Sequence, residues 1–436
     1  MHRTIFHSLQ SWAAADSKVM LLRGGRQVGK TYAVRHLSKS FDSFIEVNFE
    51  EEKDIRMLFD GSLDPVGIVR KLANYFGVGI VEGQTLLFLD EIQACPDALR
   101  SLRFFHEKMP GLHVIACGSL LEFALESIPS HGVGRITSLF MFPMSFSEFL
   151  LAMNEEGLVH EIRGSAVGRP LAPPFHSRLL DHLKTYMVIG GMPEAVQQFA
   201  KTESIADCQD VLSDLLRTLR DDFAKYRKRC PASRLNDVLE SVVFQAGGKF
   251  KYAKACHETR TDSIKSALDL LVMAGLAYRI HHSDARGFPL GAQVNTKRFK
   301  TVLLDVGLHQ RMLGLDVAPM QVTRDFDVVN RGAVAEVFAA QELRATGNPR
   351  DPRQIYYWHR EARNSNAEVD YVIQHNAEIL PVEVKAGGTG RMQSMRMFMA
   401  ERNIGRGIRT SLENFGTIDG IDIVPLYALA SHLMPV

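Results

Sequence analysis

The stretch GGRQVGKT, from Gly24 to Thr31, limits what this chain can fold into more than any other part of its sequence. It satisfies the pattern G-x-x-x-x-G-K-[ST], whose glycines let backbone N–H groups curl around an anion at the amino end of a helix. Lys30 would reach the β- and γ-phosphates of a nucleotide, and the Thr31 hydroxyl can ligate Mg²⁺. The alternative is a glycine turn ahead of an ordinary helix, but the apolar run before the stretch and the helical pattern after it favour a phosphate-binding loop. We expect the whole loop to contact nucleotide, through Gly24, Gly25, Arg26, Gln27, Val28, Gly29, Lys30 and Thr31.

Two acids at the end of an apolar run extend this candidate site. The run TLLFLDE reads as a buried strand that ends in Asp90 and Glu91. Asp90 would hold Mg²⁺ through a water molecule, and Glu91 would polarise the water that attacks the γ-phosphate. A strand also ends in acids when its terminus faces solvent, but the loop upstream favours the catalytic interpretation. The two motifs together predict an enzyme that binds ATP and Mg²⁺ and hydrolyses ATP.

Two further residues are candidates for this site. Ser119 follows the apolar strand HVIAC and would sense the γ-phosphate or its attacking water, although it would serve equally well as the cap of the next helix. Arg135, in HGVGRITSLF, is a candidate arginine finger that would act in the same chain or on a neighbouring subunit of a homo-oligomer. An ordinary surface arginine is the alternative for Arg135.

Length and composition set the remaining limits. A chain of 436 residues is too long for one ordinary core, so we expect about two to four domains. Its 46% hydrophobic and 23% charged residues are typical of a globular protein, and a net charge of +1 restricts any nucleic-acid surface to a local basic patch. The five cysteines form no C-x-x-C pair, which argues against a disulfide framework or a zinc site. No apolar run of roughly eighteen residues occurs, so we expect a cytoplasmic protein without a membrane span.

Alternation of apolar strands and helical segments in the first third of the chain predicts an α/β fold with a parallel sheet and helices on both faces. The pattern breaks near PLAPP, at 170–174, and a mostly helical stretch follows. Within it, KYAKACHETRTDSIKSALDLLVMAGLAYRI reads as two short helices, a turn and a strand, which resembles a winged helix-turn-helix. After about residue 322 the pattern returns to a helix, strands and a final α/β segment.

The winged-helix candidate carries a local basic surface that would lie against DNA phosphates. Winged helices are also common protein-interaction modules, so a DNA partner and a protein partner both stay open. The basic residues are Lys249, Lys251, Lys254, Arg260 and Lys265.

A second candidate site lies in EVDYVIQHNAEILPVEVKAG, near the end of the chain. Asp370 is on one predicted strand, and Glu383 and Lys385 share one face of the next, because residues two apart in a strand point the same way. Two carboxylates can hold Mg²⁺ while the lysine positions a water, as in a nuclease, and Glu336 on the preceding helix would add a third metal ligand. Glu368 is either a ligand or a solvated neighbour. The alternatives are a docking surface, or a structural bridge in which Lys385 pairs with the acids.

The motifs together resemble a family of prokaryotic AAA-type P-loop ATPases whose carboxyl-terminal half is an uncharacterised domain related to the PD-(D/E)XK nucleases. The resemblance spans nearly the whole chain and rests on the stretches GGRQVGKT, FLDEIQ, ACGS, GRI with FPMSFSEFL, GGMPEAV, TVLLDVGL, YYWH before EVDYVI, PVEVKAG and PLYAL. It implies an AAA-like module, a winged-helix region and a nuclease-like end domain, and it supports the roles given to Lys30, Thr31, Asp90 and Glu91.

Four domains follow from these patterns: an AAA-type core at 1–155, a helical connector at 156–205, a winged-helix region at 206–321 and a PD-(D/E)XK-like domain at 322–436. Two classes of function stay open. In one, ATP hydrolysis drives an enzyme that acts on DNA, with or without metal-dependent cleavage. In the other, the chain is a nucleotide-driven switch that binds a protein partner and carries an inactive nuclease-like scaffold.

Overall fold

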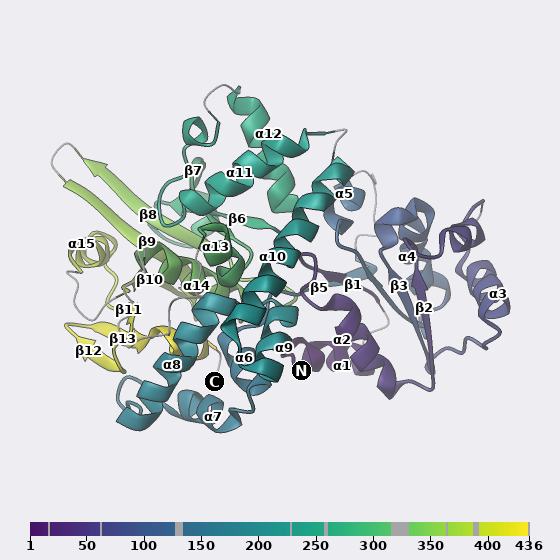
Figure 1. Cartoon of the computed structure of the whole chain (residues 1–436), viewed down its shortest axis with the longest axis horizontal. Coiled ribbons are helices and arrows are strands. Elements are labelled where there is room, and N and C mark those ends of the chain that lie inside the picture. The colour runs from purple at the N-terminus through teal and green to yellow at the C-terminus, as the bar shows by residue number, and fades with distance from the viewer. Residues whose placement is uncertain are drawn as a thin grey trace.

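The computed structural model describes residues 1–15, 18–61, 63–126, 134–226, 229–256, 260–314, 331–362, 365–386 and 392–434. Two sheets organise this part of the chain, and a group of helices lies between and below them in Figure 1. The amino-terminal sheet, in purple and blue, is on the right of that view, and the carboxyl-terminal sheet, in green and yellow, is on the left. Both sheets are combined with helices, so the predicted α/β class is confirmed.

The amino-terminal sheet has five strands in the order β2-β3-β4-β1-β5, and every neighbouring pair is parallel. Helices cover both faces, as the alternation predicted. Alternate residues of one strand serve opposite faces: Met20 and Leu22 pack in one hydrophobic cluster, and Val19 and Leu21 in another. The strands are β1 (Val19–Arg23), β2 (Ser43–Asn48), β3 (Thr85–Asp90), β4 (His113–Cys117) and β5 (Ile136–Phe140), and the helices are α1 (Ile5–Ala15), α2 (Lys30–Leu37), α3 (Pro65–Phe76), α4 (Pro96–Lys108) and α5 (Leu121–Glu126).

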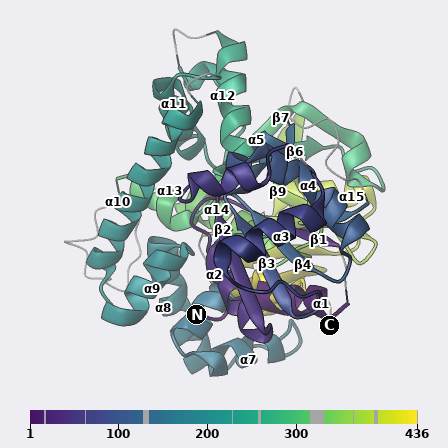
Figure 2. The ribbon, with the colours of Figure 1, turned by 90° about the vertical axis from the view of Figure 1, so that its right-hand side faces the viewer.

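The middle of the chain is helical up to β6, as predicted. Its first helix begins in a capping box, in which the Ser145 hydroxyl accepts from the backbone N–H of Glu148 and the Glu148 carboxylate accepts from the backbone N–H of Ser145. Figure 2 shows α8, α9 and α10 on the left of the view. The helices are α6 (Phe146–Ala152), α7 (Glu156–Gly164), α8 (Pro173–Ile189), α9 (Pro193–Thr202), α10 (Ile205–Asp221), α11 (Ala232–Phe244), α12 (Thr261–Met273) and α13 (Val306–Met312).

The carboxyl-terminal sheet has eight strands in the order β12-β13-β11-β10-β9-β8-β6-β7. It unites two regions that the sequence patterns separate, because β6 pairs in parallel with β8 at His281 with Tyr356 and at His282 with Tyr357. The predicted border at 321–322 lies outside the described residues. The strands are β6 (Ala277–Ser283), β7 (Val294–Leu303), β8 (Ile355–Ala362), β9 (Ser365–His375), β10 (Glu378–Val384), β11 (Gly407–Ser411), β12 (Gly416–Ile418) and β13 (Ile421–Pro425), with helices α14 (Arg331–Ala345), α15 (Gln393–Arg402) and α16 (Leu429–His432).

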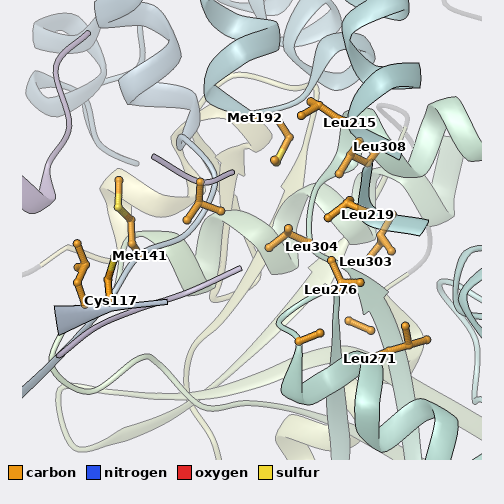
Figure 3. Close-up of a cluster of buried hydrophobic side chains, with 14 of the residues drawn as sticks. Cys117, Met141, Met192, Leu215, Leu219, Leu271, Leu276, Leu303, Leu304 and Leu308 are labelled. Atoms are coloured by element: carbon orange, nitrogen blue, oxygen red, sulfur yellow. The ribbon is translucent and has the colours of Figure 1, made fainter. Parts of the chain in front are cut away.

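One hydrophobic cluster connects the amino-terminal sheet to the rest of the molecule (Figure 3). Cys117 and Met141 enter it from the carboxyl ends of β4 and β5. Leu215 and Leu219 enter it from α10, and Leu271 from α12. Burying this apolar surface holds the two sheets in one arrangement, because separating them would expose it to water.

A buried acid, Glu342 on α14, fixes the start of α6 against the carboxyl-terminal part. Its Oε1 accepts a hydrogen bond of 2.8 Å from the backbone N–H of Phe146, and only 2% of the residue is exposed. Burial raises the pKa of Glu342 to about 8. The carboxyl group is therefore protonated in the folded protein at neutral pH.

We expect the stability of the protein to fall between about pH 5 and pH 8, partly because of Glu342. The folded state keeps a proton there that the unfolded state releases, so the stabilisation present at low pH is lost as the pH rises toward the folded pKa. Glu342→Gln should reduce this pH dependence of the denaturation midpoint in guanidinium, whereas Glu378→Gln, at an exposed position, should not. An unchanged pH dependence in Glu342→Gln would contradict the assignment.

Candidate functional site

The loop between β1 and α2 has a backbone that requires glycine at two positions. Gly24 has a φ of 143° and Gly29 a φ of 95°, which L side chains rarely adopt. A Cβ on Gly24 would also lie 2.2 Å from the carbonyl oxygen of Met141. The loop leads directly into α2, which begins at Lys30, so the first backbone N–H groups of this helix have no partner of their own within it.

Lys30 is buried and folds back on the loop. Its Nζ donates hydrogen bonds to the carbonyl oxygens of Gly24, at 3.0 Å, and Gly25, at 2.7 Å. Burial lowers the pKa of Lys30, while the nearby Glu91 and Asp90 act to raise it. The ammonium group is thus held by two neutral oxygens, and no carboxylate pairs with it directly among the described residues.

Thr31 and Asp90 lie together, as the two motifs predicted. The Thr31 hydroxyl donates to Asp90 Oδ2 at 2.9 Å, and the Cys117 thiol donates to Asp90 Oδ1 at the same distance. Parallel pairing produces this meeting, because β1, β3 and β4 all end at the same edge of the sheet. Burial raises the pKa of Asp90, and the two hydrogen bonds oppose that rise.

Glu91 is held by two polar neighbours. Its Oε2 accepts from the Gln93 side chain at 2.5 Å and from both the backbone N–H and the hydroxyl of Ser119 at 3.1 Å. Burial acts to raise the pKa of Glu91, but these hydrogen bonds and the charge of Lys30 leave it below its ordinary value. Glu91 is therefore an ionised carboxylate at neutral pH. Sequence reasoning placed Ser119 near this site but gave Gln93 no role, although Gln93 belongs to the quoted stretch FLDEIQ.

A cavity of about 530 Å³ opens beside the loop and is lined by Lys30, Thr31, Asp90, Glu91 and Ser119. Its other walls come from the amino-terminal segment and from the start of α9, which overlaps the quoted stretch GGMPEAV but was given no role in the site. The amino-terminal segment contributes Met1 and Arg3, and the start of α9 contributes Pro193, Glu194 and Gln197.

Two arginines that line this cavity also anchor the loop. Arg3 donates to the carbonyl oxygen of Val28 at 2.8 Å, and Arg26 forms an ion pair with Asp222 just after α10. Gln27 is the one non-glycine residue of the loop with a positive φ, at 60°. These contacts hold the loop between the amino-terminal segment and α10, so both regions affect its shape.

The structure does not bring Arg135 to the loop within one chain. Arg135 precedes β5 at the amino end of the strand, whereas the loop follows β1 at the carboxyl end of the parallel neighbouring strand. Its Nε forms an ion pair of 2.6 Å with Glu107. An action on the nucleotide of the same chain is therefore not supported, and an action on a neighbouring subunit stays a prediction.

The acids of the second candidate site do come together, but around a buried lysine. Lys300 Nζ, from β7, lies 2.5 Å from Glu368 Oε1, 3.1 Å from Glu336 Oε2 and 3.7 Å from Asp370 Oδ1, and its side chain is only 2% exposed. Among the described residues, no group of His, Cys, Asp or Glu is arranged to hold a metal ion. The carboxylates predicted to bind a metal ion thus lie around the ammonium group of Lys300.

Charge compensation in this acidic cluster, which consists of Glu336, Glu368, Asp370 and Glu383, comes from two lysines. Lys385 Nζ contacts Glu383 Oε1 at 2.6 Å, which is the structural bridge named as an alternative. Burial, followed by the charge of Asp370, raises the pKa of Glu336 to about 8 and that of Glu383 to about 7. The sequence did not indicate that Lys300 belongs to this cluster, because no spacing rule connects it with acids that follow it by 36 positions or more.

Comparison with known families assigns three parts of the chain. Residues 16–150 match the model of the AAA domain. This part of the chain is similar to AAA-type domains. It contains the loop, Asp90, Glu91 and Ser119, so the predicted AAA-type P-loop module is confirmed. Residues 180–318 match a domain of unknown function (DUF8612), and residues 331–429 match another (DUF4143). The carboxyl-terminal match gives no support to the predicted relationship with PD-(D/E)XK nucleases.

Solved structures with partial likeness include a Walker-type ATPase of Pyrococcus abyssi, at 13% identity and a TM-score of 0.45, over 71% of this chain and 94% of that one. They also include the ADP form of the ORC2 protein of Aeropyrum pernix, at 12% identity and a TM-score of 0.32, over 70% of this chain and 88% of that one. A search of curated proteins found no significant match. Within the described ranges, every helix is too short or too polar to span a lipid bilayer.

If Lys300 compensates the acidic cluster, Lys300→Met should destabilise the protein by roughly 3–5 kcal/mol, because it leaves buried carboxylates without a cation. Lys297→Met, at an exposed position of the same strand, is the matched control. Thermal denaturation with Mg²⁺ or Mn²⁺ should show stabilisation of Lys300→Met and none of the wild type. Equal stabilisation of the two proteins by metal would contradict this account and support the predicted metal site.

Proposed function

We propose that the chain binds ATP with Mg²⁺ at the P-loop and hydrolyses it. The observation that carries this proposal is the placement of Thr31 and Asp90 oxygens 2.9 Å apart, at the amino end of α2 and beside Glu91. A hydroxyl and a carboxylate are the donors that Mg²⁺ takes from P-loop proteins. The adjoining cavity has room for a nucleotide and is reached from the loop.

Lys30 and the loop would bind the phosphates. The two carbonyl contacts of Lys30 are neutral, so exchanging them for phosphate oxygens replaces weak hydrogen bonds by charge-assisted ones. The unpaired N–H groups at the start of α2 favour the same anion. Thr31 and Asp90 would hold Mg²⁺, which neutralises charge on the β- and γ-phosphates when bound.

Glu91 would polarise the attacking water. Its lowered pKa keeps it ionised, which a residue needs in order to accept a hydrogen bond from water. The Ser119 hydroxyl donates to Glu91, which supports the proposal that it would contact the same water or the γ-phosphate. In a homo-oligomer, Arg135 would act on a neighbour's nucleotide, since it is half-exposed and its surface ion pair with Glu107 is weak.

We expect Lys30→Ala to lose nucleotide binding, and Glu91→Gln to keep binding but lose about 10²–10⁴-fold in the rate of hydrolysis, since a general base contributes that much. Binding is measured with a fluorescent nucleotide and hydrolysis by phosphate release. Glu51→Gln, at an exposed position, should behave as the wild type.

The proposed base would be wrong if Glu91→Gln hydrolysed ATP at the wild-type rate.

The same assay over a range of protein concentrations tests the role of Arg135. A rate per chain that stays constant on dilution, for a protein shown to dissociate, would contradict action on a neighbouring subunit.

DNA is the partner that we propose for the region around α12. Lys251, Lys254, Arg260 and Lys265 are exposed on or beside the short 3₁₀ turn at Tyr252–Lys254 and the start of α12. The stretch expected to hold two short helices contains one helix, α12, after the 3₁₀ turn. Counting α11 from before the stretch, the order α11, α12, β6 and β7 suits a winged helix, whose basic surface would face phosphates. The ion pairs of Lys300 favour the inactive scaffold over nuclease activity.

The triple variant Lys251→Ala, Lys254→Ala and Lys265→Ala should bind duplex DNA more weakly, and its log-affinity should fall less steeply with log salt, by about 0.9 for each phosphate that the variant no longer neutralises. Fluorescence anisotropy over a salt series, with and without ATP, measures both quantities. Lys39→Ala with Lys201→Ala, at exposed positions elsewhere, is the control. If the wild type binds no DNA at any salt concentration, the DNA partner is contradicted and a nucleotide-driven switch with a protein partner is favoured.

A further inference from the structure

A cavity of about 670 Å³ lies between the edge strand β5 and the carboxyl-terminal part of the chain. One wall is β5 itself, where the alternate residues Ile136, Ser138 and Phe140 share one face. The opposite wall is the end of α12 and the following turn, including Val272 and Gly275. The cavity lies where two parts of the molecule meet, which is a common position for ligand sites.

Arg344, in the last turn of α14, lines this cavity with an uncompensated charge. The centre of its guanidinium group lies 4.1 Å from the ring centroid of Tyr278 and 5.5 Å from that of Phe142. Its Nε is buried and has no hydrogen-bond partner, and no carboxylate of the described residues forms an ion pair with it. Burial lowers the pKa of Arg344, but a guanidinium group remains charged at neutral pH.

The other arginine of the cavity differs in this respect. Arg23 forms an ion pair with Glu122 and lies over the ring of Phe140, 4.8 Å from its centroid. Arg344 is therefore the unpaired cation among the described lining residues. Much of the remaining lining is apolar, including Leu21, Leu121, Leu125, Met141, Met273 and Ala274.

We infer that this cavity binds a small amphipathic organic anion, whose carboxylate, sulfonate or phosphate group contacts Arg344 and whose apolar body fills the space beside it. A guanidinium group that lies over two aromatic rings is oriented in advance, so binding an anion costs little side-chain entropy. The anion would compensate a charge that the chain leaves without a partner, and the apolar walls would exclude water from the contact.

Such a ligand would also contact the region of the nucleotide site. Gly24, Gly25 and Ser119 line the cavity, and Ser119 is a hydrogen-bond donor to Glu91. Among the described lining residues, Ser119 is shared with the cavity beside Lys30, so the two ligands would occupy separate spaces. The binding site itself does not depend on the proposed ATPase activity.

Two fluorescent probes with the same aromatic body test the inference on the full chain. The anion 8-anilinonaphthalene-1-sulfonate should bind the wild type saturably and more tightly than the neutral N-phenyl-1-naphthylamine. Arg344→Gln should weaken binding of the anion by about tenfold or more and that of the neutral probe by less than about twofold, because it removes one charge-assisted contact. Ser138→Phe, which fills the cavity from β5, should weaken binding of both probes.

Two further variants control for other sites. Arg353→Gln, at another partly buried arginine outside the cavity, and Lys30→Ala should each leave the affinity for the anion unchanged. The inference is overturned if the wild type shows no saturable binding of the anion, or if Arg344→Gln binds it as tightly as the wild type. It is also overturned if Lys30→Ala loses the binding, since the probe would then occupy the P-loop.

Discussion

The close approach of Gly25 to Gly275 lets the P-loop pack directly against the carboxyl-terminal part of the chain. A Cβ on Gly275 would lie 3.2 Å from both Cα and N of Gly25, and a Cβ on Gly25 would lie 3.2 Å from a methyl carbon of Leu304. The P-loop is thus packed between its own sheet and the turn that leads from α12 into the carboxyl-terminal sheet. A movement of the P-loop on binding nucleotide would therefore displace the turn after α12, which belongs to the region proposed to bind DNA.

Two buried lysines illustrate how their surroundings decide what a charge can do. Lys30 contacts neutral carbonyl oxygens, so an incoming phosphate improves its electrostatic environment. Lys300 is surrounded by Glu336, Glu368 and Asp370, so it already has anionic partners within the fold. The first site is suited to binding a ligand and the second to holding β7, α14 and β9 together.

Local pattern was enough to predict the parts of the structure that depend on neighbouring residues. The P-loop, the parallel sheet around it and the meeting of Thr31 with Asp90 follow from short motifs and from strands that end at one edge. Contacts between segments far apart in the chain could not be predicted from the sequence. The pairing of β6 with β8 depends on register between distant segments, and Lys300 enters the acidic cluster through that sheet. Arg344 likewise reaches its cavity through tertiary packing that no spacing rule contains.

The central claim is that Lys30, Thr31 and Asp90 form a site for ATP with Mg²⁺. Isothermal titration of ATP into the wild type and into Thr31→Val, with Mg²⁺ and with EDTA, tests it most directly. We predict one nucleotide bound per wild-type chain, with higher affinity in Mg²⁺ than in EDTA, and loss of that difference in Thr31→Val because the hydroxyl ligand is gone. Absence of saturable binding, or equal affinity of the wild type with and without Mg²⁺, would contradict the claim.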